Sequence, residues 1–302
     1  MNHIVAVVVT YNRKELLKEC IENLLLSDTK CDILVVDNHS TDGTEKSIYE
    51  YIQRKDIVYW NTGSNLGGAG GFSYGIRKAI EMGYDYVWLM DDDCMVHRDT
   101  LTEFVKAHNK IVNERNEKYG FLSSKVLWKD GQICQMNVQR YPLTQNIKDF
   151  SQNLQPAYMA SFVSLFVSAE IIKEMGLPIK EFFIWSDDWE YTRRISRRYP
   201  CFVVTSSEVT HKSASNIGAK IESDSKERLD RYKYLYRNDV YLYRREGIKG
   251  FTYETGRIIA HCLRVIFKSK DSKMDKLKII IGSTIKGFSF KPEIEFVGEQ
   301  ND

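Results

Sequence analysis

The sequence lacks several features that would place it in a well-defined class. It has no apolar run of the roughly eighteen residues that a membrane-spanning helix needs. Its first apolar run, Ile4 to Val9, is too short for a secretory signal and carries no basic flank before it. The six cysteines form no C-x-x-C pair, which favours free thiols in a reducing cytosol over disulfides or a zinc site. We therefore expect a cytoplasmic protein that is soluble or peripheral on the inner face of the plasma membrane.

The chain also lacks a strong net charge, internal repeats and low-complexity segments. Its 43 basic and 41 acidic residues nearly cancel, which argues against a general nucleic-acid binder. With 302 residues, 43% of them hydrophobic, it is long enough for one large domain and an appendage. We expect a core domain over residues 1–215 and a helical, basic and aromatic C-terminal extension over residues 216–302.

The sequence does contain an apolar run that ends in three consecutive carboxylates. The run from Tyr86 to Met90 is typical of a buried parallel strand, and Asp91, Asp92 and Asp93 follow where open α/β sheets bind ligands. Two aspartates one residue apart on an extended edge point the same way, so Asp91 and Asp93 can reach one cation that holds a phosphate. The alternative is a solvated acidic turn, which is costly without counter-charge.

Two earlier apolar runs also end in polar residues. The run from Ile4 to Val9 leads through residues 10–13 into a helical stretch that ends near Leu26. A second run, Ile33 to Val36, leads into the polar segment 37–44. This segment faintly resembles a calcium loop but lacks the closing acid of an EF-hand. Buried strands that alternate with helices predict an α/β fold.

A glycine-rich segment follows a third short strand, Ile57 to Trp60. It holds five glycines between residues 63 and 71. Glycines let the backbone approach a ligand closely and present N–H groups to anionic oxygens at the start of a helix, here predicted over Phe72 to Met82. A dinucleotide-binding fingerprint is disfavoured because it would follow the first strand.

A second acidic motif lies among aromatic residues between Phe182 and Tyr191, ahead of a predicted basic helix from Thr192 to Arg198. A carboxylate there can accept a proton from a hydroxyl group, and the aromatic rings suit the apolar faces of sugars. Together with a cation site and an anion cradle, this predicts transfer chemistry on a nucleotide-activated donor. A nucleotidyltransferase or a metal-dependent phosphatase explains the aromatic acidic motif less well.

These motifs resemble the inverting family 2 glycosyltransferases, which have the GT-A fold. The resemblance covers residues 1–215 and rests on Val7 to Arg13, Val35 to Thr44 and Asp91 to Asp93. The segment from Asn65 to Phe72, followed by the triple aspartate, is similar to bacterial galactofuranosyltransferases. The resemblance implies an α/β fold in which helices flank a mixed, nucleotide-sugar-binding sheet.

The resemblance also implies a role for individual residues. It makes Asp91, Asp93 and His211 the ligands of a divalent cation, Mn²⁺ or Mg²⁺, and Asp188 the general base. Acceptor contacts or shaping of the site are assigned to Trp185, Asp187 and Glu190, although Trp185-Ser186 departs from the order found in many relatives. Nucleotide-sugar contacts are assigned to Thr10, Arg13, Asp37, Asn65, Gly67, Gly68 and Asp92.

The implied function is metal-dependent, inverting sugar transfer from UDP-galactofuranose to a glycan or lipid-linked acceptor in bacterial surface-polysaccharide synthesis. One alternative is a rhamnosyltransferase that uses dTDP-rhamnose. Another is a non-catalytic protein that binds nucleotides or carbohydrates with a degenerate site, which the intact acids Asp91, Asp93 and Asp188 oppose. We expect no nucleic-acid partner, and the oligomeric state stays open.

The C-terminal extension matches no motif of the family. Arg228 to Arg245 is dense in Arg, Lys and Tyr, and Gly256 to Gly287 alternates apolar residues with Lys and Arg at helical spacing. Interleaved aromatics and cations suit an interfacial helix on an anionic membrane surface. The alternatives are amphipathic helices packed on the core, and aromatic stacking on single-stranded nucleic acid, which nothing else supports.

Overall fold

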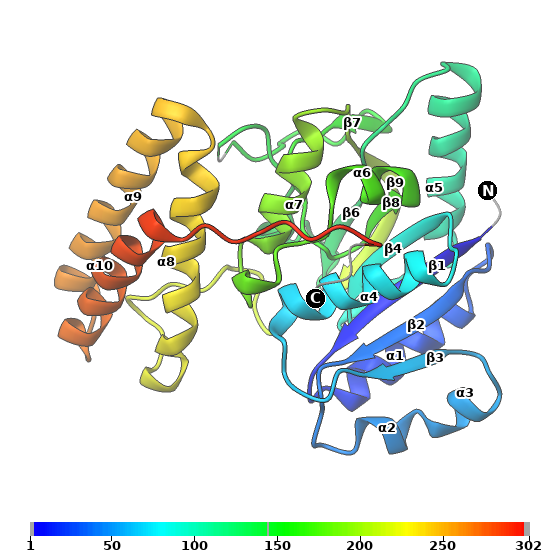
Figure 1. The fold of residues 1–302 in the computed structure, drawn as a ribbon, viewed down its shortest axis with the longest axis horizontal. Coiled ribbons are helices and arrows are strands. Elements are labelled where there is room, and N and C mark those ends of the chain that lie inside the picture. The colour runs from blue at the N-terminus through cyan, green and yellow to red at the C-terminus, as the bar shows by residue number, and fades with distance from the viewer. Residues whose placement is uncertain (1–2, 144, 299–302) are drawn as a thin grey trace.

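One mixed β-sheet of nine strands organises the residues that the computed structural model describes, 3–143 and 145–298 (Figure 1). The strands are β1 (Ile4–Thr10), β2 (Asp32–Asp37), β3 (Val58–Asn61), β4 (Tyr86–Asp91), β5 (Cys94–Val96), β6 (Leu122–Trp128), β7 (Leu154–Pro156), β8 (Leu165–Ser168) and β9 (Phe202–His211). Their order is β3-β2-β1-β4-β8-β6-β9-β5, and β7 pairs with β9.

Helices cover both faces of this sheet and form a separate group at its side. The α-helices are α1 (Lys14–Leu25), α2 (Thr44–Ser47), α3 (Tyr49–Gln53), α4 (Gly67–Glu81), α5 (Thr100–His108), α6 (Ala169–Met175), α7 (Asp187–Ser196), α8 (Leu229–Arg244), α9 (Gly247–Lys268) and α10 (Lys273–Ser289). A π-helical turn (Asn109–Glu114) extends α5, and short 3₁₀ turns occupy Gln135–Asn137, Lys180–Phe182 and Lys226–Arg228.

Strands β3, β2, β1 and β4 run parallel to one another. Their register places Thr10 opposite Asp37, Asp37 opposite Asn61, and Val9 opposite Asp91. Because parallel strands end at the same edge of a sheet, the polar residues that follow each apolar run meet there. This edge carries the candidate site.

The β-branched composition of β1 follows from its burial on both faces. Alternate side chains enter two separate cores: Ala6 packs with Leu17 of α1 on one face, and Val7 packs with Ile76 of α4 on the other. The sheet is therefore fixed between two apolar layers, and its edge is held in a defined position.

The helices after β9 lie beside the sheet, with α8 next to the core and α9 and α10 outside it (Figure 1). After α10 the chain returns across the molecule, where Arg77 of α4 pairs with Glu295 at 2.7 Å and donates to the carbonyl oxygen of Phe296 at 3.2 Å. Among the described residues no helix is both long and apolar enough to cross a membrane. The boundary at residue 215 stays a prediction.

Several predicted element bounds were wrong. Helix α4 begins at Gly67, five residues before the predicted start at Phe72, because its glycines let it lie close to the sheet. A Cβ atom added to Gly75 would lie 2.5 Å from Cγ1 of Val7. Helix α7 begins at Asp187 and not at Thr192, so the second acidic motif forms its first turn.

Candidate functional site

The three aspartates at the end of β4 have different partners. Asp92 is buried and accepts hydrogen bonds from Oγ1 of Thr10 at 2.7 Å and from Arg13 at 3.2 Å. Arg13 also pairs with Asp93 at 2.7 Å. The Asp91 carboxylate makes no hydrogen bond or ion pair with any described residue, and burial together with Asp93 raises the pKa of Asp91 to about 7. The cluster therefore contains more negative charge than its protein partners balance.

His211 joins this cluster from the other half of the sheet. It ends β9 opposite Cys94, so the strand register brings its ring next to Asp93. Nε2 of His211 lies 3.1 Å from Oδ1 of Asp93, and Nδ1 lies 2.7 Å from Oδ1 of Asn137 and 3.7 Å from Sγ of Cys134. Burial opposes a charge on the ring, but the hydrogen bond to Asp93 outweighs it and raises the pKa of His211 to about 10.

The second acidic motif forms the first turn of α7. Burial and the Asp91 carboxylate raise the pKa of Asp187 to about 7, so the two acidic segments are electrostatic neighbours although they are far apart in sequence. Asp188 is partly exposed as a residue, but the protein around its carboxyl group removes water from it and, together with Asp187, raises the pKa of Asp188 well above its usual value. The Trp189 N–H group donates to Oδ1 of Asp188 at 2.7 Å.

Two further residues of this motif contact protein groups. Glu190 is buried and pairs with Arg194 at 3.0 Å. The ring of Trp185 lies 5.1 Å from that of Tyr232 of α8, measured between centroids. These contacts anchor the motif, and the roles of Trp185, Asp187 and Glu190 in acceptor binding stay predictions.

The glycine-rich segment lies against the turn that precedes α7. The Gly67 N–H group donates to Oδ1 of Asn65 at 2.9 Å, and a Cβ atom on Gly67 would lie 2.1 Å from the carbonyl oxygen of Phe183. The Ala69 N–H group donates to the same oxygen at 3.2 Å. Gly68 borders open space, with no atom within 4 Å of an added Cβ. Part of the predicted anion cradle thus bonds to the protein, and Gly68 remains open to a ligand.

Asp37 lies at the end of β2 with both carboxylate oxygens in use. Its Oδ1 accepts from the Ser40 N–H group at 2.8 Å, and its Oδ2 accepts from the Tyr59 hydroxyl at 2.7 Å. A concavity of about 690 Å³ beside it is lined by Tyr59, Asn61 and residues of the segment 40–50.

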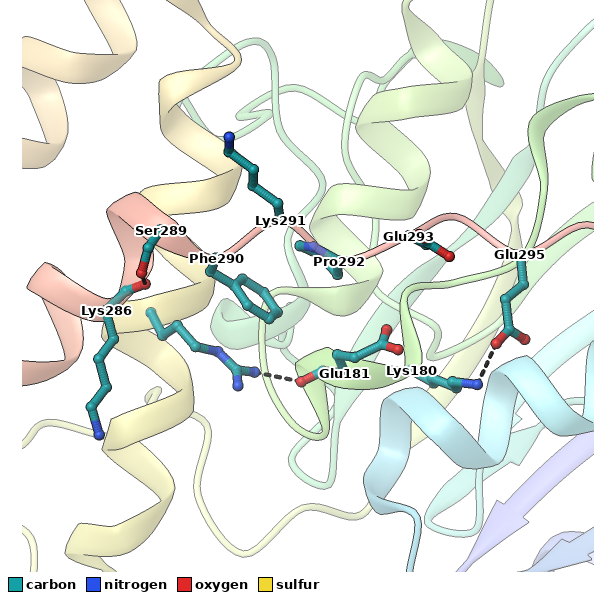
Figure 2. Close-up of a pocket in the computed structure, with 10 residues that line it drawn as sticks. Lys180, Glu181, Lys286, Ser289, Phe290, Lys291, Pro292, Glu293 and Glu295 are labelled. Atoms are coloured by element: carbon teal, nitrogen blue, oxygen red, sulfur yellow. Dashed lines mark hydrogen bonds and ion pairs between the residues drawn. The ribbon is translucent and has the colours of Figure 1, made fainter. Parts of the chain in front are cut away.

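A larger concavity of about 900 Å³ contains none of these acids. It lies between the returning C-terminal segment and the 3₁₀ turn at Lys180 and Glu181, as Figure 2 shows. Lys180 pairs with Glu295 across it. It is therefore separate from the candidate site.

The residues predicted to bind a cation have suitable ligand atoms, but their side chains are not arranged around a common point. Within residues 3–143 and 145–298, no group of three or more His, Cys, Asp or Glu side chains is placed to hold a metal ion. Arg13 and His211 instead occupy the oxygens of Asp93. The two carboxylates suit Mn²⁺ or Mg²⁺, and a cation would balance the excess negative charge around Asp91. The ligand set Asp91, Asp93 and His211 stays a prediction.

Sequence reasoning missed several residues that support this site. Asn137 and Cys134 contact the ring of His211, and the guanidinium carbon of Arg140 lies 4.3 Å from the centroid of the Trp189 ring. All three belong to a region without a recognisable motif. Their partners are more than forty residues away in the sequence, so no local pattern marks them.

Comparisons with known proteins show which families and proteins this chain resembles. Residues 5–113 match the model of glycosyl transferase family 2. The galactofuranosyltransferase GlfT1 of Mycolicibacterium smegmatis is 26% identical over 263 residues, which cover 81% of this chain and 84% of the relative. A poly-beta-1,6-N-acetyl-D-glucosamine synthase of Staphylococcus aureus is 31% identical over 90 residues, 30% of this chain and 21% of that protein.

Solved structures show the same fold. S. aureus TarS 1–349 in complex with UDP-GlcNAc superposes with a TM-score of 0.55 at 15% identity, covering 95% of this chain and 73% of that chain. The mannosyltransferase PcManGT from Pyrobaculum calidifontis, in complex with GDP-Man and Mn²⁺, gives 0.55 at 15%, covering 96% and 76%. The GT-A-type mixed sheet with a C-terminal helical extension, and the family resemblance, are confirmed.

Proposed function

We propose that this protein, a glycosyl transferase family 2 member over residues 5–113, transfers a sugar from UDP-galactofuranose with inversion at the anomeric carbon. The observation that carries the proposal is that the turn before α7 bonds to the glycine-rich segment, through the Phe183 carbonyl oxygen and the Ala69 N–H group, and that Asp187 lies close enough to Asp91 for their charges to interact. In this proposal the acidic segment at the end of β4 holds the donor diphosphate. The second acidic motif activates an acceptor hydroxyl.

The donor side consists of residues from the parallel strand ends. Asp91, Asp93 and His211 would hold a divalent cation, which neutralises the diphosphate leaving group when it is bound. Gly68 borders the open space at the start of α4, where a helix N-terminus favours anionic oxygens. The concavity beside Asp37 would take the uracil ring.

The acceptor side is assigned to Asp188. In an inverting reaction the acceptor hydroxyl attacks from the face opposite the departing UDP, so the base cannot be a cation ligand. Burial raises the pKa of Asp188, which suits a carboxylate that takes up a proton during the reaction. The acceptor is a glycan or lipid-linked oligosaccharide of a bacterial surface polysaccharide.

A donor screen tests the substrate. Purified protein with Mn²⁺ or Mg²⁺ is offered UDP-galactofuranose, UDP-galactopyranose, UDP-N-acetylglucosamine and dTDP-rhamnose, and nucleotide release is measured. We expect turnover of UDP-galactofuranose, in line with the name of the relative that covers 81% of this chain. Turnover of dTDP-rhamnose alone would favour a rhamnosyltransferase. No turnover of any donor, with UDP still bound, would favour a non-catalytic binding protein.

Removal of the cation tests the ligand set. An excess of chelator is expected to abolish nucleotide release, and added Mn²⁺ or Mg²⁺ should restore it, because the diphosphate needs a counter-charge. The Asp93→Ala variant should stay inactive when the cation is restored. Full activity in chelator would refute the cation requirement.

The C-terminal helices offer a surface for an anionic membrane. Of the sixteen large apolar side chains that are exposed among the described residues, ten lie on α9 and α10: Ile248, Phe251, Ile259, Leu263, Ile266, Phe267, Met274, Ile281, Ile285 and Phe288. The rings of Phe251 and Phe288 lie 6.5 Å apart, so the two helices share this face. From Gly247 to Lys291 the chain carries ten basic and three acidic residues. An apolar face flanked by cations fits a negatively charged lipid surface.

A further inference from the structure

The turn before the second acidic motif has an unusual backbone. Phe183, Trp185 and Ser186 have φ angles of 62°, 66° and 66°, in the left-handed region that residues with side chains rarely adopt. Each such residue costs about 1–3 kcal/mol, so the conformation persists only where surrounding contacts hold it. The turn leads directly into Asp187 and Asp188, and its conformation sets the direction in which α7 presents them.

Asn238 of α8 holds this turn from one side. It is fully buried, and its Nδ2 atom lies within hydrogen-bonding distance of three successive parts of the turn: the carbonyl oxygens of Phe182, Ile184 and Trp185, at 3.0, 3.2 and 2.9 Å. Its Oδ1 accepts from Arg237, so the amide is held in one orientation. No other side chain type of this size both donates two protons to the turn and accepts from Arg237.

Asp239, the next residue of α8, holds the residue that precedes α7. Its Oδ1 accepts from the Ser186 hydroxyl at 2.5 Å, and its Oδ2 pairs with Arg257 of α9 at 2.6 Å. Arg257 also bonds to Glu254 at 2.7 Å, and both acids are buried. Ser186 is therefore connected to α9 through a chain of buried charged groups.

The glycine-rich segment holds the same turn from the opposite side. The carbonyl oxygen of Phe183 accepts from the Ala69 N–H group, and Gly67 leaves no room for a side chain against it. The turn thus lies between the predicted donor loop and the C-terminal extension, and it carries the predicted base.

We infer that Asn238 and Asp239 are positioning residues for the general base, and that the C-terminal extension is thereby part of the catalytic apparatus. The inference rests on the proposed function of Asp188. The side chains of Asn238 and Asp239 are both buried, and both bond to the turn. They hold the left-handed turn so that α7 directs Asp188 at the acceptor hydroxyl.

The test compares Asn238→Ala and Ser186→Ala with Tyr236→Phe. The control removes a hydrogen bond of the same helix that involves no atom of the turn, between the Tyr236 hydroxyl and Nδ1 of His261 at 2.8 Å. Phenylalanine keeps the ring, whose centroid lies 5.8 Å from the guanidinium carbon of Arg257. Nucleotide release gives kcat and KM, titration with UDP gives donor-side affinity, and amide hydrogen exchange reports on the peptide 182–190. Ser186→Ala removes only one hydroxyl, so it serves if Asn238→Ala does not fold.

We expect kcat to fall by about 10- to 100-fold in the first two variants, since displacing a catalytic group by about 1 Å has effects of this size. UDP affinity should stay within about threefold of the wild type, because the variants lose an interaction that is made only in the transition state. Exchange in the peptide 182–190 should rise in these variants and stay unchanged in Tyr236→Phe.

The inference is overturned if kcat in both variants equals that of the control, or if UDP affinity and unfolding temperature fall in proportion to kcat. It is also overturned if exchange of the peptide 182–190 does not change, a result that needs no substrate. A different outcome would refute the proposed function. In that case the wild-type protein turns over no nucleotide sugar, while exchange of the peptide 182–190 still rises in Asn238→Ala.

Discussion

At the scale of single residues, the candidate site depends on which carboxylates are free to react. Asp92 and Asp93 are bonded to Thr10, Arg13 and His211, and Glu190 is paired with Arg194. Asp188 is partly exposed, and the neighbouring Trp189 N–H group donates to its carboxylate. The Asp91 carboxylate lacks a hydrogen-bond partner among the described residues, so low engagement fits both Asp91 and Asp188, and the role of Asp188 as the base stays a prediction.

Replacement of Asp188 by Asn tests that assignment. Asp188→Asn keeps the shape of the side chain but removes the proton acceptor, so turnover should fall by roughly 10²- to 10⁴-fold, the usual contribution of a general base. UDP binding, measured by calorimetry, should stay intact. Near-normal turnover in Asp188→Asn, combined with a loss in Asp187→Asn or Glu190→Gln, would move the base to whichever residue failed.

At the scale of elements, the contact between α4 and the turn before α7 makes one glycine far less replaceable than its neighbour. Gly67 has a φ of +72° and lies against the Phe183 carbonyl group, whereas Gly68 borders open space. Gly67→Ala should lower the free energy of unfolding by about 2 kcal/mol or more, from backbone strain plus overlap. Gly68→Ala, in a helix with room for a methyl group, should change it by less than about 1 kcal/mol. Urea unfolding of both variants measures this, and equal losses would contradict the packing described.

The packing of α8 against α9 predicts a pH dependence. Burial and the charges of Arg257 and Arg264 lower the pKa of His261 to about 4, although Glu222 and Asp239 act in the opposite direction. In the unfolded chain the ordinary value is near 6.5, so the folded state favours the neutral ring. Its stabilisation is complete above about pH 6.5 and is lost as the pH falls toward 4.

His261→Asn isolates this effect, because the amide keeps a polar atom near the Tyr236 hydroxyl and cannot take up a proton. Thermal unfolding of both proteins across this pH range gives the measurement. We expect the advantage of the wild type over the variant to shrink, or to reverse, toward pH 4. An advantage that stays constant with pH would show that the ring does not become charged on unfolding.

The same elements show what the sequence could and could not predict. The β-branched run of β1 and the apolar run of β4 identified buried parallel strands, because such strands need apolar side chains on both faces. The predicted start of α4 was wrong because Gly67 to Gly71 form helix despite the low helix propensity of glycine. Close packing of α4 on the sheet needs glycine at positions such as Gly71. Asn238 was missed because its partners are about fifty residues away and are backbone carbonyl groups, which leave no trace in the side-chain pattern.

At the scale of the whole molecule, the C-terminal extension connects the catalytic sheet to a surface of different character. Its inner helix, α8, holds the turn before Asp188 through Asn238. Its outer helices, α9 and α10 in Figure 1, carry the exposed apolar residues and the excess of basic residues. A membrane that contacts α9 and α10 would therefore lie two helical layers from the base, which suits an acceptor whose lipid anchor stays in the bilayer.

Binding to vesicles tests this arrangement. Sedimentation with phosphatidylglycerol vesicles should retain the protein, and added salt should weaken the binding because the cations of α9 and α10 supply part of the attraction. The double variant Phe267→Ser/Ile285→Ser removes two side chains that are 79% and 64% exposed, so it should bind less without losing stability. Leu26→Ser, at a 57% exposed position at the end of α1, is the matched control and should bind as the wild type does. Equal binding to neutral and anionic vesicles, or binding to neither, would show that α9 and α10 only pack against the rest of the protein. The reason is that basic residues beside an apolar face should make binding to the anionic lipid stronger.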